Sequence, residues 1–270
     1  MAGAPELPQA TLERSHPIAY TEAGAGDIVL LIHGSLCDYR YWRWQIPQLS
    51  ASYRVVAASL RGCWPRAGTH PDPGYRIATH VEDMIALTDA LGDGRPVHVL
   101  GHSRGAQIAL EFALRAPERC KTLTLADPGF RFTHEAPVEP FYLPAVDLLA
   151  QGETDAAAEQ FIDTVNGAGT WRKMVGWFKQ MVRDNAATLR SQVLEANRPE
   201  HLEDIGRIEC PVLLLGGADS PARYAARQDQ LQAVLPRARR EVIRLAAHGM
   251  NLANPRAFNR ACLAFLGDGA

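Results

Sequence analysis

Ser103 stands at the centre of Gly101-His102-Ser103-Arg104-Gly105, a match to the pattern Gly-x-Ser-x-Gly. The preceding residues, Val97–Leu100, are typical of a strand, and those that follow are apolar at helical spacing. A serine held in a sharp turn between strand and helix needs flanking residues without a Cβ atom, because the two elements approach closely there. We therefore predict that Ser103 is a nucleophile and that Gly101 and Gly105 are required sterically. The helix N-terminus would direct backbone N–H groups at a developing anion.

A serine hydroxyl needs a base, and the base needs a carboxylate that orients it. Candidates for both follow later strand-like runs: Asp219 comes after Pro211–Leu215, and His248 comes after Val242–Leu245. Loops at the carboxyl ends of parallel strands open on one side of a sheet, so the three side chains can converge. Asp127, at the end of another strand, is the alternative acid. We favour Asp219 because a glycine-rich turn precedes it.

The order Ser103, Asp219, His248 resembles that of the α/β-hydrolase superfamily, and the resemblance runs from about Thr11 to the C-terminus. The stretch Leu30-Leu31-Ile32-His33-Gly34-Ser35 matches the family's strand followed by a His-Gly oxyanion loop. The resemblance implies that Ser35 and Arg104 contribute backbone N–H groups to an oxyanion hole. It also implies that Gly34 lets the chain pass close to the reacting carbonyl and that His33 orients the loop.

Two features depart from relatives of this fold. The family often shows Asp-x-Arg-Gly-x-Gly-x-Ser after its fourth strand, whereas Ser59–Pro65 keeps only Arg-Gly. The nucleophile is serine, which argues against the alkyl-halide and epoxide opening done by relatives with an aspartate there. Arg104 is interpreted as a solvated or supporting side chain, and attraction of an anionic substrate is the alternative.

Short runs rich in Val, Ile and Leu alternate with longer helical patterns, which predicts a doubly wound, mostly parallel α/β sheet of about eight strands. The expected strands are Pro17–Tyr20, Ile28–Ile32, Arg54–Ala58, Val97–Gly101, Lys121–Ala126, Pro211–Gly216 and Glu241–Leu245. The expected helices are Ala78–Leu91, Ala106–Leu114, Ala222–Leu235 and Asn254–Leu266.

The alternation stops between Pro128 and Pro211, where helix patterns occur without a clear strand. We expect a hydrolase core of residues 1–128 and 206–270 and an inserted helical cap, or lid, of residues 129–205. Within the insertion, one apolar stripe at helical spacing is predicted to face the core. It comprises Trp171, Met174, Val175, Phe178, Met181 and Val182.

The composition narrows the class of protein. The 270 residues carry a net charge of −2, which gives no electrostatic footprint for nucleic acid or an anionic membrane. No apolar run approaches the roughly 20 residues of a membrane helix, and the start of the chain lacks the features of a secretory signal. Five widely spaced cysteines without a CxxC pair favour neither a disulfide framework nor a zinc site. We expect a cytoplasmic protein; the oligomeric state is open.

Together these features predict a serine hydrolase that cleaves a small carboxylic ester, lactone or thioester through an acyl-enzyme, with no cofactor and no metal. Its expected partner is a small-molecule substrate. Three alternatives remain: hydrolysis of a C–C bond in a vinylogous diketone, a non-hydrolytic reaction of the fold, and a small-molecule receptor. The non-hydrolytic reactions are perhydrolysis, hydroxynitrile cleavage and cofactor-free oxygenation.

Overall fold

The structure is a computed structural model that describes residues 7–268, except for 14–15, 67, 133–134, 136–138, 197–204 and 236. The start of the chain, where no secretory signal is expected, therefore lies partly outside the described residues. The same holds for most of the junction near residue 205, where the expected cap ends.

Eight strands form a single sheet in the order β1-β2-β4-β3-β5-β6-β7-β8, and all neighbours from β4 to β8 pair in parallel. The predicted doubly wound sheet is confirmed. The strands are β1 (Ala10–Leu12), β2 (Ile18–Ala23), β3 (Ile28–Ile32), β4 (Arg54–Ala58), β5 (Val97–His102), β6 (Cys120–Ala126), β7 (Val212–Gly217) and β8 (Arg239–Ile243).

The sequence patterns locate the inner strands better than the outer ones. β3 and β4 have the predicted bounds, whereas β8 lies two residues earlier than expected and β1 was not predicted. β1 has only three residues, none of them fully buried, and pairs with β2 alone. An edge strand of this kind lacks the continuous apolar run that marks a strand buried on both faces.

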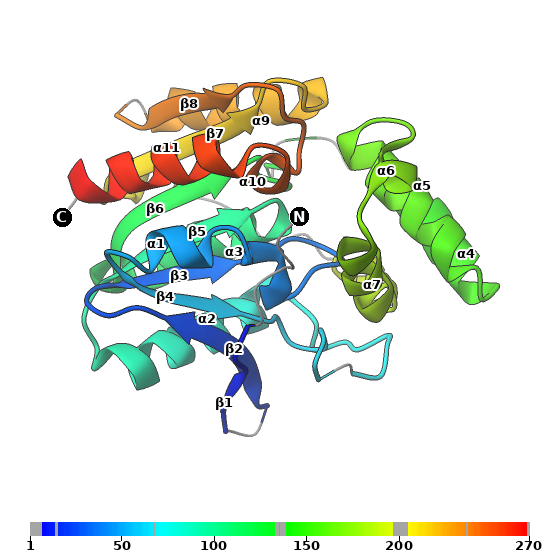
Figure 1. Cartoon of the computed structure of the whole chain (residues 1–270), viewed down its shortest axis with the longest axis horizontal. Coiled ribbons are helices and arrows are strands. Elements are labelled where there is room, and N and C mark those ends of the chain that lie inside the picture. Colours follow the sequence, from blue (N-terminus) through cyan, green and yellow to red (C-terminus); the bar gives the residue numbers. More distant parts are fainter. Residues whose placement is uncertain are drawn as a thin grey trace.

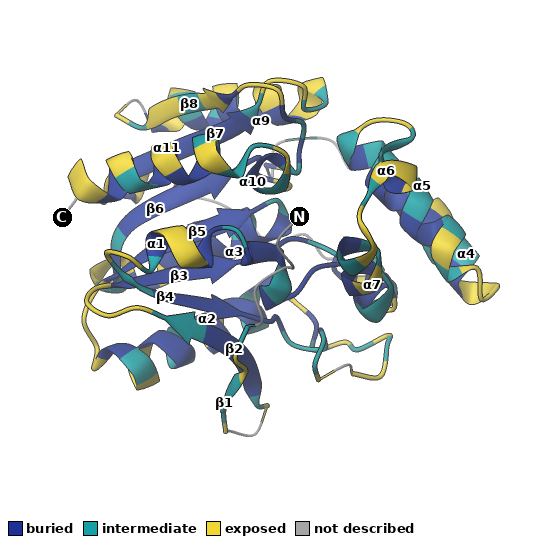
Figure 2. Cartoon of the chain, viewed as in Figure 1, coloured by how far each residue is buried: buried dark blue, intermediate teal, exposed yellow. Residues whose placement is uncertain are grey.

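Side chains of alternate strand residues divide between two cores, one on each face of the sheet. Val29 and Leu31 face α1 (Ile46–Leu49) and α11 (Pro255–Asp268). Leu30 and Ile32 face α2 (Ile77–Gly92), α3 (Arg104–Arg115) and α9 (Ala222–Val234). Figure 2 shows a buried sheet between helices whose outer faces are exposed.

The chain between β6 and β7 contains only helices among its described residues, as expected. They are α4 (Leu143–Ala150), α5 (Thr154–Asn166), α6 (Thr170–Lys173), α7 (Gly176–Asn185) and α8 (Thr188–Ala196). Figure 1 shows α4 to α7 to one side of the molecule, beyond the arrowheads of β3 and β5.

The predicted apolar stripe of this insertion is interrupted. α6 ends at Lys173, and Met174 and Val175 have extended backbones before α7 begins. Val175 is consequently 54% exposed, whereas Trp171, Phe178, Met181 and Val182 are buried in the core as predicted.

Among the described residues, no helix is long and apolar enough to cross a membrane.

Candidate active site

Ser103 lies at the sharp turn between β5 and α3. Its φ of 56° and ψ of −120° are a conformation that non-glycine residues rarely adopt. The backbone holds it there, because Ser103 N donates to Ala126 O at 2.9 Å and Gly129 N donates to Ser103 O at 3.1 Å. The side chain is partly exposed. A strained serine at the carboxyl edge of a sheet is the arrangement of a nucleophile elbow.

The two glycines of the pentapeptide are required by close backbone contacts. A Cβ atom on Gly101 would lie 2.1 Å from Gly105 O, and one on Gly105 would lie 2.2 Å from Ile32 O. Both distances are far below van der Waals contact. Both positions therefore require glycine for the steric reason expected from the sequence.

His248 lies in the loop after β8, and its ring contacts the carboxylate of Asp127 after β6. The distance from His248 Nδ1 to Asp127 Oδ2 is 3.3 Å, and both side chains are buried. Asp127 Oδ2 also accepts a hydrogen bond of 2.5 Å from Ser220 Oγ, and Gln228 Nε2 donates to Asp127 Oδ1 at 3.3 Å. The structure thus pairs His248 with Asp127, the alternative acid.

Asp219, the favoured acid, does not reach the imidazole. It is exposed in the turn after β7, and its backbone N–H donates to Ala246 O at 2.9 Å. That bond holds the turn in a conformation in which Ser220, not Asp219, lies against the His248–Asp127 pair. The expected contact of Asp219 with His248 is therefore absent among the described residues, and Asp127 contacts the ring instead. Spacing alone could not distinguish them, because both aspartates follow parallel strands at the same edge.

Burial controls the protonation of the pair. Burial, together with a smaller effect of the nearby Arg223 guanidinium, lowers the pKa of His248 to about 3. Burial also raises the pKa of Asp127 to about 6, although the hydrogen bond from Ser220 opposes that rise. At neutral pH the pair is therefore a neutral imidazole beside an ionised carboxylate, as a general base and its orienting group require.

Two further rings hold His248 in place. Tyr224, on α9, stacks on its ring with centroids 4.1 Å apart and planes 17° apart. His102, next to Ser103, lies 4.6 Å from it between centroids and donates from Nε2 to His248 O at 2.8 Å. The residue beside the serine thus touches the histidine loop, which places the two loops together. Neither of these two contacts of His248 is indicated by the sequence motifs.

His33 and Gly34 place the loop after β3 against the serine. His33 Nδ1 donates to Gly34 O at 2.8 Å, and its Nε2 accepts from Leu60 N at 3.0 Å, so the ring ties this loop to the end of β4. Burial lowers the pKa of His33 to about 4, which keeps the ring neutral. A Cβ on Gly34 would lie 2.9 Å from Ser103 Cβ. The loop therefore runs directly beside the elbow.

Helix α8 contacts both residues expected to form the oxyanion hole. Ser35 Oγ donates to Gln192 Oε1 at 2.8 Å. The Arg104 side chain is buried and forms an ion pair with Glu195, and its guanidinium lies 5.0 Å from the Tyr75 ring centroid. Arg104 is thus a supporting residue and not a solvated one. Gln192 and Glu195 were missed because polar residues on a surface-like helix usually indicate solvent exposure.

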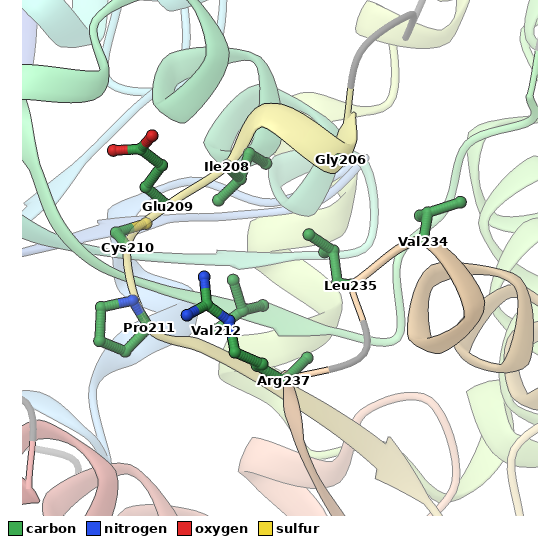
Figure 3. Close-up of a pocket in the computed structure, with 10 residues that line it drawn as sticks. Gly206, Ile208, Glu209, Cys210, Pro211, Val212, Val234, Leu235 and Arg237 are labelled. Atoms are coloured by element: carbon green, nitrogen blue, oxygen red, sulfur yellow. The ribbon is translucent and has the colours of Figure 1, made fainter.

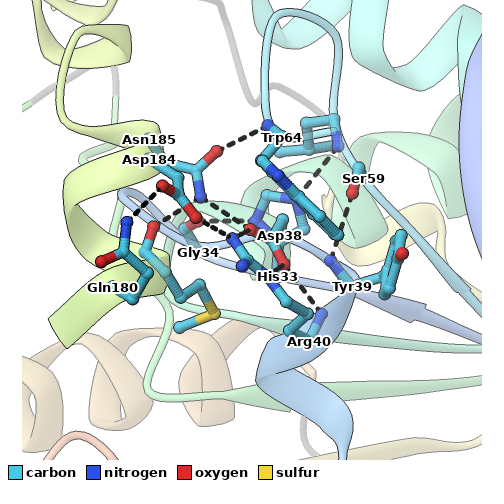
Figure 4. A network of polar contacts seen from close by, with 12 residues as sticks. His33, Gly34, Asp38, Tyr39, Arg40, Ser59, Trp64, Gln180, Asp184 and Asn185 are labelled. Atoms are coloured by element: carbon cyan, nitrogen blue, oxygen red, sulfur yellow. Dashed lines mark hydrogen bonds and ion pairs between the residues drawn. The ribbon is translucent and has the colours of Figure 1, made fainter. Parts of the chain in front are cut away.

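A second polar network joins α7 to the loop after β3, which contains Asp38 (Figure 4). The buried carboxylate of Asp38 accepts from Arg40 Nη2 at 2.6 Å and from Asn185 Nδ2 at 2.7 Å. Asn185 Oδ1 accepts from Trp64 N at 2.8 Å, and Asp184 accepts from Arg40 Nη2 at 2.8 Å. The helical insertion is therefore attached to the core through buried hydrogen bonds beside the site.

In the part of the chain that the structure describes, no group of three or more His, Cys, Asp or Glu residues is arranged so that it could hold a metal ion.

The family model described as "Alpha/beta hydrolase family" matches residues 29–261. The chain belongs to the alpha/beta hydrolase family. This confirms the resemblance and the fold inferred from the motifs.

Several relatives of this alpha/beta hydrolase are similar over nearly the whole chain. RutD of Caulobacter sp. (strain K31), provisionally named a carbamate hydrolase, is 28% identical over 271 residues, which cover 93% of this chain and 94% of that protein. The structure of a hydrolase from Pseudomonas aeruginosa PA01 has a TM-score of 0.77 at 26% identity and covers 99% of this chain and 100% of its own. The Thermogutta terrifontis esterase shares the fold, with a TM-score of 0.80 at 22% identity over 97% of this chain and 99% of its own. These relatives support a hydrolase without indicating its substrate.

Proposed function

We propose that this hydrolase cleaves a small carboxylic ester, lactone or thioester through an acyl-enzyme on Ser103. The observation that carries the proposal is the buried contact of 3.3 Å between His248 Nδ1 and Asp127 Oδ2 at the edge of the sheet where Ser103 is strained. A carboxylate that fixes the tautomer of an imidazole beside a serine is the arrangement that activates a hydroxyl group.

In the proposed reaction Ser103 Oγ attacks the carbonyl carbon while His248 Nε2 takes the hydroxyl proton. The ionised Asp127 keeps the proton of His248 on Nδ1 and stabilises the imidazolium that forms. His248 then protonates the leaving alcohol or thiol, and water releases the acyl group by the same route in reverse.

The oxyanion of the tetrahedral intermediate would be stabilised by the backbone N–H groups of Ser35 and Arg104. Arg104 N is the first amide of α3, where the helix dipole favours negative charge. Its side chain is anchored by Glu195, and the Ser35 side chain is anchored by Gln192. Both donors therefore belong to residues whose positions are fixed before substrate binds.

The helical insertion, residues 129–205, would act as a cap over this site. α8 contacts the residues of both oxyanion donors, so the space beside Ser103 is bounded by a helix that is hydrogen-bonded to the core. If the insertion encloses the site, it would exclude water and favour short substrates. We expect a preference for compact apolar acyl or aromatic groups over long lipid chains, and a cytoplasmic location suits such substrates.

The test is a panel of p-nitrophenyl esters of increasing chain length, together with lactones, thioesters and a vinylogous diketone, on wild type and Ser103→Ala. We expect turnover of short esters or lactones, and a loss of about 10³-fold or more in Ser103→Ala. The variant should remain folded, because alanine occupies the same turn.

Labelling by a fluorophosphonate distinguishes the mechanism from the substrate. We expect wild type to be labelled and Ser103→Ala not to be. Persistent labelling of the variant, or an unchanged reaction rate, would reject Ser103 as the nucleophile. Specificity that rises steadily with acyl length and increases at a lipid interface would indicate a lipase and contradict the closed site.

A further inference from the structure

Two cysteine thiols meet at the end of the sheet opposite the candidate active site. Cys120 is the first residue of β6, and Cys210 precedes β7, the adjacent parallel strand. Their Sγ atoms are 3.7 Å apart, and both thiols are free. The backbones are already joined nearby, since Leu123 N donates to Pro211 O at 2.9 Å. The sulfur atoms thus need only a small side-chain movement to reach the bonding distance of about 2.05 Å.

The two thiols differ in access. Cys120 is buried, whereas Cys210 is partly exposed and lines a pocket of about 430 Å³ (Figure 3). The pocket is formed by the segment from Gly206 to Val212 and by the connection between α9 and β8, which includes the guanidinium of Arg237. A small reagent can therefore reach Cys210 from solvent, and Cys120 lies behind it as a resolving thiol.

The electrostatics favour the same division of roles. The hydrogen-bonded contact with Cys120 lowers the pKa of the Cys210 thiol, whereas the same contact and burial raise the pKa of Cys120. The thiolate is the reactive form of cysteine. Attack by Cys210 followed by resolution by Cys120 is consequently the favoured order.

We propose that Cys120 and Cys210 form a dithiol site that a hydroperoxide oxidises to an intramolecular disulfide. Cys210 loses its proton, and the thiolate attacks the terminal hydroxyl oxygen of the hydroperoxide, so that an S–O bond forms and the O–O bond breaks. The alkoxide leaving group takes the proton that Cys210 lost and departs as an alcohol, or as water where the oxidant is hydrogen peroxide. The Cys120 sulfur then attacks the resulting sulfenic acid. An S–S bond forms, the S–O bond breaks, and the hydroxyl group leaves as water with the Cys120 proton. Two thiols are oxidised by two electrons, and the hydroperoxide is reduced to alcohol and water.

The disulfide would join the chain segments that enter and leave the helical insertion. The closed loop contains about 90 residues and includes all of α4 to α8. A cross-link that closes so long a loop restricts the unfolded chain strongly. Oxidation is therefore expected to make the folded protein, with its insertion attached, more resistant to heat.

The experiment treats the reduced full-length protein with one equivalent of hydrogen peroxide or cumene hydroperoxide and follows intact mass, free thiols and peptide maps. We expect wild type to lose the mass of two hydrogen atoms, its five free thiols to fall to three, and one linked peptide to join Cys120 to Cys210. The melting temperature should rise by about 5 °C and return on reduction with dithiothreitol.

Variants separate the two roles. Cys120→Ser should leave a Cys210 sulfenic acid that dimedone traps, and Cys210→Ser should not react. Cys262→Ser is the control and should behave as wild type, because Cys262 is fully buried elsewhere in the fold. Alanine replaces serine if a variant does not fold. Retention of all five thiols, a disulfide between other cysteines or between two chains, or sulfinic acid on Cys210 in wild type would each overturn the proposal. None of these readouts depends on hydrolase activity.

Discussion

The carboxylate of Asp127 is fully buried, and Ser220, Gln228 and His248 contact it. Its backbone φ is 39°, so the residue is also conformationally unusual. A buried carboxylate lowers the stability of the folded protein unless hydrogen bonds compensate for its lost hydration. Buried carboxylates with a shifted pKa are common at functional sites. These contacts are the reason that we propose Asp127, and not Asp219, as the acid that orients His248.

A matched pair of variants tests that assignment. Asp127→Asn should reduce kcat/KM by about 10² to 10⁴, because the amide favours the wrong tautomer of His248. Asp219→Asn, the control at the exposed turn, should change it by less than about threefold. Steady-state kinetics on the best ester of the panel decides between them. The reverse ranking would return the acid to Asp219.

The protonation of the same pair predicts the pH profile. The reactive form needs neutral His248 and ionised Asp127, and the pKa of Asp127 is raised to about 6 whereas that of His248 is lowered to about 3. Since a carboxylic acid loses its charge below its pKa, kcat/KM should rise with pH through about 6 and level off above it. A pH profile from 4.5 to 8.5 measures this, and a midpoint unchanged in Asp127→Asn would show that another group is responsible.

At the scale of the elements, α8 is held to the core by a buried ion pair. Arg104 begins α3, and Glu195 lies on α8; their side chains are 7% and 9% exposed. Glu195 also accepts a hydrogen bond from Ile77 N at the start of α2. A single carboxylate on α8 therefore contacts residues of both α3 and α2. Removal of one partner of a buried pair leaves the other charge uncompensated.

Glu195→Gln should accordingly lower the free energy of unfolding by about 3 kcal/mol. Asp155→Asn is the matched control, because it removes a carboxylate from an exposed pair with Arg183 that is expected to contribute less than about 1 kcal/mol. Urea unfolding at pH 7.5 measures both. Equal effects of the two substitutions would mean that the Arg104 pair does not anchor α8.

At the scale of the whole molecule, several histidines are buried in the neutral form. Burial lowers the pKa of His33 and His98 to about 4 and that of His102 to about 3, and it lowers the pKa of His80 as well. In the unfolded chain these groups would titrate near 6.5. Below that pH the unfolded state binds more protons than the folded state, so acid favours unfolding.

The stability of the protein should thus be complete above about pH 6.5 and fall by several kcal/mol as the pH drops toward 4. Asp127 opposes this trend below about pH 6, because its raised pKa favours the folded state there, but it is one group against several histidines. Urea unfolding at pH 7.5, 6 and 5 provides the measurement. His98→Asn, which can keep the hydrogen bond to Thr122, should show a shallower pH dependence than wild type. An identical dependence would exclude His98 as a contributor.

The sequence by itself determined the parallel strands and the helices that flank them, and it placed Ser103 and His248 in the segments that follow two of those strands. These features follow from local patterns: continuous apolar runs, helical periodicity, and glycines such as Gly101 on either side of the serine, where the structure leaves no space for a Cβ atom. Such patterns depend on neighbours in the chain and can be read without knowing the fold.

Only the tertiary structure showed that Asp127, and not Asp219, contacts His248, and that Gln192 and Glu195 contact Ser35 and Arg104. Both aspartates follow strands at the same edge, and their difference lies in which turn directs its side chain toward His248. The polar face of α8 is buried because the insertion folds back over the loops after β3 and β5. These contacts join residues about 90 or more positions apart, so their pairing depends on the folded arrangement of strands and helices and leaves no local pattern in the sequence.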